Sequence, residues 1–348
     1  MYRVWNFIAN YSILLISGAL VALIWANVNP QSYHHFVEFP IWFNDHIGLD
    51  YSYWAKSFGH GYEKFGSSGN LKVLSLHYLV NDMLMAFFFA IAAKEVWEAV
   101  ILKNGSLRGK KAATPLFATL GGMLGPVAVY LVLAAFMGSD TYNAVANGWA
   151  IPTATDIAFS YLVGRLVFGA GHPAVRFLLL LAIADDAAGL IILAVFYPQG
   201  DLAPIWLMLS LGAAVAAYVL FNLMPRRMDA GNQLRPVSTW VRNYLSFWPY
   251  LLAACLSWYG FMRAGLHPSL GLLPIVPAIP HADRAFGIFA GAEQYLKDML
   301  NRCEHLLKHP VEVVLFFFGL LNAGVEFGAM GAATWLVLAG LLIGKPFG

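Results

Sequence analysis

Residues Val175–Phe196 read VRFLLLLAIADDAAGLIILAVF, an apolar run with two adjacent carboxylates, Asp185 and Asp186, near its middle. Crossing the hydrocarbon core of a bilayer takes about 20 mostly apolar residues in a helix, so this run is long enough to span. Ionisable side chains at that depth are costly and usually mark an ion or proton pathway. The alternative is a carboxylate pair that is neutralised by protonation or by a buried base and has no role in transport.

The composition of the whole chain indicates a membrane protein. The chain has 348 residues, of which 59% are hydrophobic and 11% charged, and its mean hydropathy is +0.64. This apolar surface exceeds what one aqueous core can hide. The two cysteines, Cys255 and Cys303, are too few and too scattered for a disulfide framework or a zinc site. We expect an all-α polytopic membrane protein with one transmembrane domain over residues 1–348, contacting membrane lipids, with no cofactor and no nucleic-acid partner.

Apolar runs predict about ten membrane segments. They cover residues 11–27, 77–102, 113–137, 149–168, 174–196, 204–223, 247–263, 266–280, 310–327 and 331–348. Most lysines and arginines fall in the loops on one side of this arrangement, as Lys110 and Arg226 do. Because cytoplasmic loops are enriched in basic residues, we expect a cytoplasmic amino terminus.

Two stretches stand out between these segments. Residues 28–76 form a long external excursion rich in aromatic residues and glycine, in which we expect a small hairpin or an interfacial element. Residues 224–246 form a basic cytoplasmic insertion, for which contact with anionic lipid headgroups is the default role.

The fourth segment carries Pro152, Thr153, Thr155 and Asp156 near its middle. This pattern predicts a broken helix, which membranes tolerate where the backbone lines a cavity. The alternative is that Thr153, Thr155 and Asp156 only cap the second half-helix, whose positive end favours the carboxylate of Asp156.

Other charged residues also fall inside predicted segments. Adjacent helical residues point ~100° apart, so Asp185 and Asp186 have different neighbours, and Lys345 is the obvious base for one of them. A lysine near a helix end can instead extend to the headgroups. Asp82 is either intramembrane or interfacial, and Glu95 and Glu98 share one helix face as an acidic entrance or a solvated helix end.

Six runs together resemble the NhaA family of sodium/proton antiporters, in order and at family-like spacing. They are VNDMLMAFFFAIAAKEV (80–96), GWAIPTATDIAFSYLVGRL (148–166), LLLLAIADDAAGLIILAVFY (178–197), RAGLHPSLGLL (263–273), FFFGLLNAGVEF (316–327) and LAGLLIGKPFG (338–348). The resemblance implies an NhaA-like fold with a broken fourth helix and inverted repeats that meet near the bilayer midplane.

The resemblance also implies roles for the central residues. Asp186 would bind sodium or lithium ions and protons in alternation, and Asp185 would share the site or pair with Lys345. Asp156 would balance the helix-end dipoles, and Thr155 would help to coordinate the ion.

Three further residues match family positions outside that centre. Asp82 and Glu95 would belong to the cytoplasmic-side pathway and the pH response. His267 would lie near the external surface.

The implied activity is electrogenic export of Na⁺ or Li⁺ in exchange for H⁺, by a multi-pass protein of the bacterial inner membrane. It is a secondary active transporter rather than an enzyme, and a homodimer is expected, formed through residues 28–76. Sodium is a hard cation that prefers oxygen ligands, so sodium and protons can compete for one carboxylate and thereby exchange.

The sequence departs from the family at two places. After Glu95 it reads Val96-Trp97-Glu98-Ala99 where the family has a basic run, so pH regulation is expected to differ. It stops at Gly348, whereas the family continues for two more helices, so we expect a truncated antiporter or a shortened homologue without exchange. Sodium-coupled symport of a small solute is a further alternative. An intramembrane aspartyl protease is disfavoured because its two aspartates lie on different helices.

Overall fold

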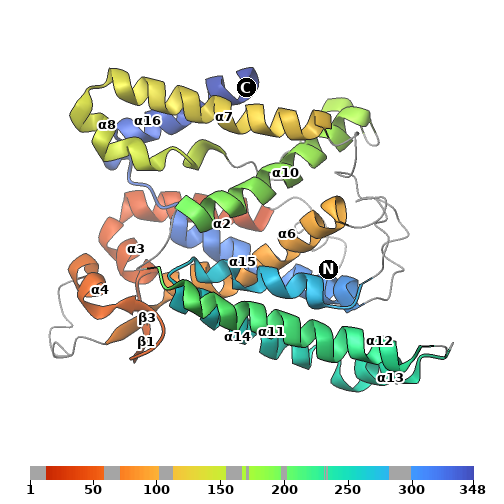
Figure 1. Ribbon diagram of the computed structural model, residues 1–348. Coiled ribbons are helices and arrows are strands. Elements are labelled where there is room, and N and C mark those ends of the chain that lie inside the picture. The colour runs from red at the N-terminus through yellow and green to blue at the C-terminus, as the bar shows by residue number, and fades with distance from the viewer. Residues whose placement is uncertain are drawn as a thin grey trace. The chain divides into compact units, whose positions relative to one another are not determined.

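A computed structural model describes residues 13–58, 71–101, 113–153, 167–169, 172–196, 202–230, 232, 234–281 and 299–348 (Figure 1). Most of these residues are helical, as predicted. Contacts between Cα atoms divide the chain into two compact units: unit 1 contains residues 1–88 and 308–330, and unit 2 contains residues 89–307 and 331–348. Two helices, α6 (Met85–Val100) and α15 (Met299–Asn322), contribute to both units.

The described part of residues 28–76 folds into short helices and a small sheet within unit 1. Its elements are α3 (Pro30–Val37), β1 (Pro40–Asn44), β2 (Leu49–Asp50), α4 (Tyr51–Phe58) and β3 (Lys72–Ser75). The strands pair antiparallel in the order β1-β3-β2, with α4 between β2 and β3 in the chain, so this region forms a small sheet in which the consecutive strands β1 and β2 do not pair as a hairpin. Trp54 is only 1% exposed beneath this sheet, and its ring centroid lies 6.0 Å from that of Phe43.

The first described helix, α2 (Ile13–Val28), packs against the second half of α15 through glycines. A Cβ atom on Gly18 would lie within 3.0 Å of the carbonyl oxygen of Phe316, and one on Gly319 would lie 2.6 Å from that of Leu15. The two helices therefore touch through their backbones, with no side chain between them.

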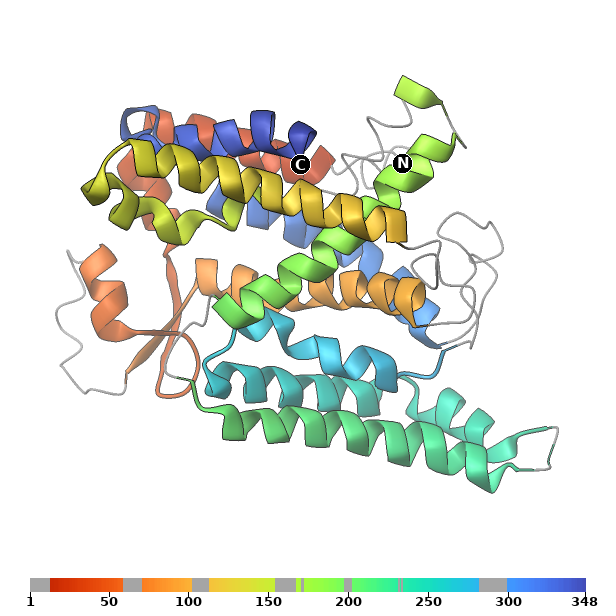
Figure 2. The ribbon, with the colours of Figure 1, turned by 45° about the horizontal axis from the view of Figure 1, so that its top comes forward.

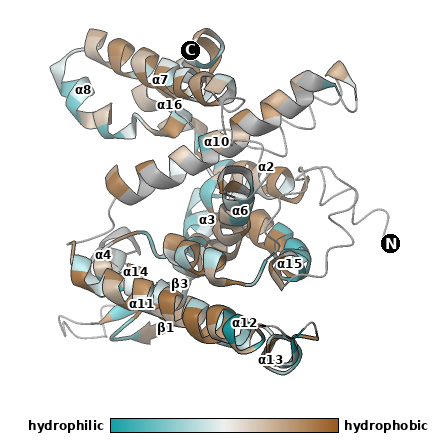
Figure 3. Ribbon diagram, turned by 45° about the vertical axis from the view of Figure 1, so that its right-hand side comes forward, coloured by the Kyte–Doolittle hydropathy of each residue, from teal (hydrophilic) through white to brown (hydrophobic). Residues whose placement is uncertain are grey.

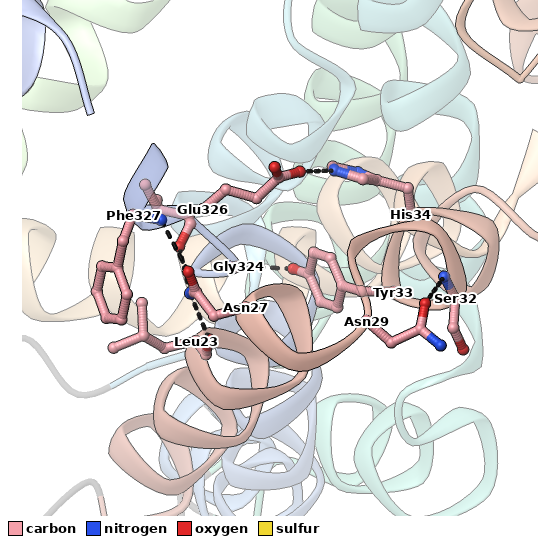
Figure 4. A network of polar contacts seen from close by, with 10 residues as sticks. Leu23, Asn27, Asn29, Ser32, Tyr33, His34, Gly324, Glu326 and Phe327 are labelled. Carbon is pink, nitrogen blue, oxygen red and sulfur yellow. Dashed lines mark hydrogen bonds and ion pairs between the residues drawn. The ribbon is translucent and has the colours of Figure 1, made fainter. Parts of the chain in front are cut away.

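Polar contacts fix the loop after α15 to α2 and α3 (Figure 4). The Asn27 side chain donates to the carbonyl oxygen of Val325 at 2.9 Å and accepts from the amide of Phe327 at 2.8 Å. The Tyr33 hydroxyl accepts from the amide of Gly324 at 3.1 Å. His34 Nε2 lies 3.0 Å from Glu326 Oε1. These contacts pair backbone groups of the loop that follows α15 with side chains of α2 and α3.

Strand β3 continues directly into a long helical stretch. It comprises α5 (Leu76–Tyr78), the π-helical turn η1 (Leu79–Leu84) and α6. Ser75 Oγ caps its start by accepting from the amide of Tyr78 at 3.2 Å. The π-helical turn contains Asn81 and Asp82, and such turns occur frequently at functional sites.

In unit 2, one helix packs against many of the other elements. It is α7 (Ala113–Phe136), and it packs against α8 (Ser139–Val145), the 3₁₀ turn η4 (Ile151–Thr153), α10 (Pro173–Phe196), α16 (Ala332–Ala339), the π-helical turn η11 (Gly340–Gly344) and α17 (Lys345–Phe347). Between α8 and η4 lies a second 3₁₀ turn, η3 (Ala146–Gly148). The Tyr130 hydroxyl on α7 donates to the carbonyl oxygen of Val145 at 2.8 Å.

A helical hairpin forms a second part of unit 2. After the 3₁₀ turn η5 (Pro204–Trp206) it runs through α11 (Leu207–Tyr218), the π-helical turn η6 (Val219–Leu223), α12 (Met224–Met228), α13 (Pro236–Trp240), the π-helical turn η7 (Val241–Leu245) and α14 (Trp248–Ala264). Figure 2 shows α11 and α14 side by side, and the 3₁₀ helix η8 (Pro268–Ala278) packs on both. Ser210 Oγ and Ser257 Oγ lie 2.5 Å apart between them.

The surface of these helices suits a bilayer. Among the described residues, the helices Leu76–Glu98, Leu116–Phe136 and Pro204–Met228 are long and apolar enough to cross a membrane. Exposed apolar side chains line one face of α7, where Phe117 is 74% and Leu124 63% exposed. Figure 3 shows α11 as mostly hydrophobic, with hydrophilic residues at α12 and α13. Exposed apolar stripes of this length are unfavourable in water and favourable in lipid.

Most predicted segments coincide with helices, and the ninth has wrong bounds. Residues 113–137, 174–196 and 247–263 match α7, α10 and α14. The segment predicted at 310–327 belongs to α15, which begins at Met299 and ends at Asn322. The polar stretch before Pro310 suggested a loop, but the helix continues through this proline. Residues 154–166 lie outside the described residues, so the break at Thr155 and Asp156 stays a prediction.

Candidate functional site

Asp185 lies inside unit 2 beside a lysine that is distant in sequence. Asp185 is on α10 and is 1% exposed. Lys345 Nζ lies 3.7 Å from Asp185 Oδ2. The same ammonium donates to the carbonyl oxygen of Thr153 at 2.8 Å. Lys345 therefore bridges a buried carboxylate and the backbone that directly precedes the predicted break in the fourth segment.

Each partner has a local reason for its place. Thr153 ends η4, where its hydroxyl donates to the carbonyl oxygen of Ala150 at 2.6 Å, and Pro152 beside it is fully buried. Lys345 directly follows the π-helical turn η11, so its side chain leaves the helix at a local irregularity. The carbonyl of Thr153 is a backbone acceptor, and the ammonium of Lys345 is a suitable donor for it.

The electrostatics of this cluster favour retention of the charges as a pair. Removing a carboxylate from water costs several kcal/mol unless a counter-charge and hydrogen bonds compensate it. Lys345 supplies the counter-charge, with its Nζ 3.7 Å from Asp185 Oδ2 and its side chain only 19% exposed, and the hydrogen bond to Thr153 holds the ammonium there. Carboxylate and carbonyl oxygens are also the ligands that hard cations prefer. The atoms that hold the ammonium are thus of the type that binds sodium.

A second charged cluster, also in unit 2, lies between the second half of α6 and the first half of α15. Lys94 is 4% exposed, and its Nζ lies 2.6 Å from Glu304 Oε2 on α15 and 3.2 Å from Glu98 Oε1 one turn along α6. The indole Nε1 of Trp97 donates to Nε2 of His281 at 3.3 Å. His281 Nδ1 in turn lies 2.7 Å from the carbonyl oxygen of Ile279.

Comparison with known proteins decides the family. The family model described as "Na+/H+ antiporter 1" matches residues 4–348. The chain belongs to the NhaA family of sodium/proton antiporters. An NhaA from Jannaschia sp. (strain CCS1) is 70% identical over 348 residues, covering 100% of this chain and 80% of that protein. An NhaA from Geobacter sulfurreducens is 44% identical over 347 residues, covering 99% of this chain and 77% of that protein.

This membership makes the chain an integral membrane transporter of the NhaA type rather than an enzyme. The central residues expected from the NhaA resemblance are only partly described. Asp185 and Lys345 are brought together, as one of the two expected arrangements requires. Asp186 follows on α10, about 100° further round the helix axis, and its side chain lies outside the described residues. Thr155 and Asp156 lie outside them as well.

The three outer NhaA positions fall in different places. Asp82 lies in η1 of unit 1 and is 6% exposed. Glu95 lies on α6, but its side chain is outside the described residues. His267 directly precedes η8, and its Nδ1 lies 2.7 Å from Ser269 Oγ.

Sequence reasoning missed several contacts of these two clusters. The carbonyl oxygen of Thr153 is a backbone atom, so residue type carries no signal for it. Lys94 was left without a partner, because Glu304 is 210 positions away. Glu98 was read as an entrance or a solvated end, and it is instead held by Lys94. A lysine inside an apolar helix was the available signal.

Proposed function

We propose that this protein exports sodium or lithium ions across the bacterial inner membrane in exchange for protons. The observation that carries the proposal is the buried Asp185 with Lys345 at 3.7 Å, within a chain of the NhaA family. Relatives at 70% and 44% identity bear the name Na(+)/H(+) antiporter NhaA. A buried carboxylate that accepts one cation at a time is what exchange at a single site requires.

In the proposed cycle, protons and sodium compete for the carboxylates. Asp186 is the principal ligand, and Asp185 alternates between Lys345 and the site. When sodium binds, the oxygens of Asp185 and Thr153 exchange contact with the ammonium for contact with the ion. When protons bind, the carboxylates lose their charge and sodium leaves. Transport of more protons inward than sodium ions outward makes the exchange electrogenic, driven by the membrane potential.

The surrounding architecture is proposed by family analogy. The fourth segment is a broken helix in which Asp156 compensates helix-end dipoles and Thr155 contributes an oxygen ligand. The chain crosses the membrane about ten times with a cytoplasmic amino terminus. Glu95 and Asp82 belong to the pathway and the pH response.

The proposal is tested by sodium-induced dequenching of a pH-reporting dye in everted membrane vesicles. Vesicles with the wild-type chain, Asp185→Asn, Asp186→Asn and Asp140→Asn are compared at equal expression. Asp140 is an exposed carboxylate in the first turn of α8, which makes it a matched control. We expect dequenching for the wild type and Asp140→Asn and its loss for Asp186→Asn. A wild-type chain that is well expressed and silent to both sodium and lithium would contradict antiport.

The same assay separates antiport from sodium-coupled symport. Antiport needs no organic solute, so sodium alone must drive the proton signal. Dequenching that depends on an added solute would instead support the symporter.

A further inference from the structure

Two glycines form the contact that brings Lys345 to its place. Gly344 directly precedes Lys345, and Gly125 lies opposite on α7. A Cβ atom on Gly125 would lie within 3.0 Å of the carbonyl oxygen of Gly344, and one on Gly344 would lie within 3.0 Å of the backbone of Pro126. The end of the chain and α7 lie side by side in Figure 2, and here they touch through backbone atoms.

The π-helical turn before Lys345 also touches the Thr153 region. A Cβ atom on Gly340 would lie 3.2 Å from both the carbonyl oxygen of Pro126 and Cβ of Pro152. Pro152 precedes Thr153, whose carbonyl oxygen accepts from Lys345. One face of η11 therefore contacts both α7 and the turn that supplies the acceptor.

Helix α7 contacts the third partner as well. Its Thr119 hydroxyl lies 3.5 Å from the carbonyl oxygen of Leu181 on α10, one helical turn before Asp185. The backbones that carry Asp185, Thr153 and Lys345 thus all rest on α7. The separations of 3.7 Å and 2.8 Å from the ammonium depend on how closely each backbone approaches this helix.

We infer that Gly125 and Gly344 are positioning residues for ion exchange, because their side-chain-free contact sets Lys345 between Asp185 and Thr153. This inference rests on the proposed antiport. A methyl group at either position must push the end of the chain away from α7, since backbone atoms on the other side cannot yield. A hydrogen bond that starts at 2.8 Å is lost beyond about 3.5 Å, so a shift of about 1 Å is enough to break it.

The expected consequence concerns competition between protons and sodium. When the ammonium withdraws, the Asp185 carboxylate loses a favourable positive charge and holds its proton more firmly. Sodium loses the same competitor, because the ammonium contacts the oxygens of Asp185 and Thr153 that the ion would take. Loss of about 1.4 kcal/mol of this interaction therefore lowers the apparent KM for sodium about tenfold at alkaline pH, where protons do not compete. At sodium concentrations below the KM it moves half-maximal exchange about one pH unit to the alkaline side.

The alternative is that these glycines serve packing alone. A purely structural role predicts lower thermal stability, with the KM for sodium and the pH profile unchanged. The decisive readouts are therefore the KM and the pH profile, measured beside the melting temperature.

The test compares Gly125→Ala, Gly344→Ala and the double variant with Gly122→Ala, in everted vesicles at several pH values and sodium concentrations. Gly122 lies on the same helix, and no described atom lies within 4 Å of its added Cβ. We expect both single variants to lower the KM for sodium about tenfold at alkaline pH, the double variant to lower it by less than the product of the two, and Gly122→Ala to stay within about twofold.

The outcomes separate the two hypotheses. A silent wild-type chain overturns the proposed antiport together with this inference. An active wild type with Gly125→Ala and Gly344→Ala matching Gly122→Ala in KM and pH profile overturns the positioning role alone. If Gly125→Ala does not fold, Gly340→Ala provides the milder displacement, since its contacts at 3.2 Å require a shift of only a few tenths of an ångström. It must then show a smaller change in the same direction, and an unchanged profile overturns the inference.

Discussion

Lys94 Nζ lies 2.6 Å from Glu304 Oε2, and this ion pair joins α6 to the first half of α15. Their side chains are 5% and 28% exposed, so solvent screens the pair only partly. Lys94→Met leaves the partly buried carboxylates of Glu304 and Glu98 without this ammonium. We expect it to lower the free energy of unfolding by roughly 2 kcal/mol.

A double-variant cycle checks that contribution. Lys94→Met, Glu304→Gln and the double variant are compared by thermal unfolding in detergent. The double variant should be less destabilised than the sum of the two single variants, because each single change removes the same pair. Strict additivity would contradict a direct interaction.

Lys345→Met tests the charge partner of Asp185. Because the buried carboxylate loses its ammonium, we expect a loss of about 3 kcal/mol in stability if the carboxylate stays ionised. Uptake of a proton relieves that cost, so exchange should require higher pH than in the wild type. Dequenching is measured from pH 6.5 to pH 9 in everted vesicles.

The companion variants separate stability from exchange. Asp185→Asn combined with Lys345→Met removes both charges and should recover most of the melting temperature, while exchange stays impaired. A wild-type pH profile for Lys345→Met alone would contradict a role for this pair.

We expect the stability of the turn that Asp229 holds in the basic insertion, residues 224–246, to depend on pH. Asp229 Oδ1 accepts from the amide of Val237 at 2.9 Å, and its Oδ2 accepts from the amide of Ser238 at 2.7 Å. Desolvation alone would raise the pKa of Asp229, but the hydrogen bonds from Ser238 and Val237 and the charge of Arg235 outweigh it and lower this pKa. Because the pKa of Asp229 is lower in the folded state than in the unfolded state, the ionised carboxylate stabilises the turn at pH values above the unfolded pKa of about 4. This stability is lost as the pH falls further.

Hydrogen exchange of the amides of Val237 and Ser238 measures this effect. We expect their protection to persist at neutral pH and to fall below about pH 4 after correction for the intrinsic exchange rate. Asp229→Ala should remove the protection at all pH values, whereas Asp140→Ala, on exposed α8, should leave it intact. Protection that survives Asp229→Ala would contradict the capping role.

Asn81 and Asn322 form a reciprocal amide pair in unit 1. Each side-chain nitrogen donates to the oxygen of the other at 3.0 Å, and Asn81 Nδ2 also lies 2.9 Å from His77 Nε2. Asn322→Leu should destabilise the protein by about 1 kcal/mol, as interhelical polar contacts in membranes do. Thermal unfolding of Asn81→Leu, Asn322→Leu and the double variant measures their coupling, and zero coupling would contradict the pair.

The sequence predicted the chemistry of the site better than its geometry. Two aspartates in an apolar run and a lysine near the end of the chain were enough to expect that one aspartate pairs with Lys345. The family resemblance named Asp185 for this pair as one of two arrangements, and the two groups lie 3.7 Å apart. Thr153 was not predictable as an acceptor, because a carbonyl oxygen is common to all residues. The π-helical turns at Asp82 and before Lys345 leave no pattern in residue type. The start of α15 was missed, because Pro310 and the charged residues before it resemble a loop.

The ring of His281 links α6 to the segment after η8 in only one protonation state. Its Nδ1 faces the carbonyl oxygen of Ile279 at 2.7 Å, and a carbonyl can only accept, so this nitrogen carries the proton. Its Nε2 faces the indole Nε1 of Trp97 at 3.3 Å, and an indole N–H can only donate, so this nitrogen must keep its lone pair. A second proton, on Nε2, would point at the indole hydrogen of Trp97, and the repulsion between the two donors would break this hydrogen bond. The end of α6 is therefore joined to the residues after η8 by a link that exists with a neutral ring and is broken when the ring becomes an imidazolium.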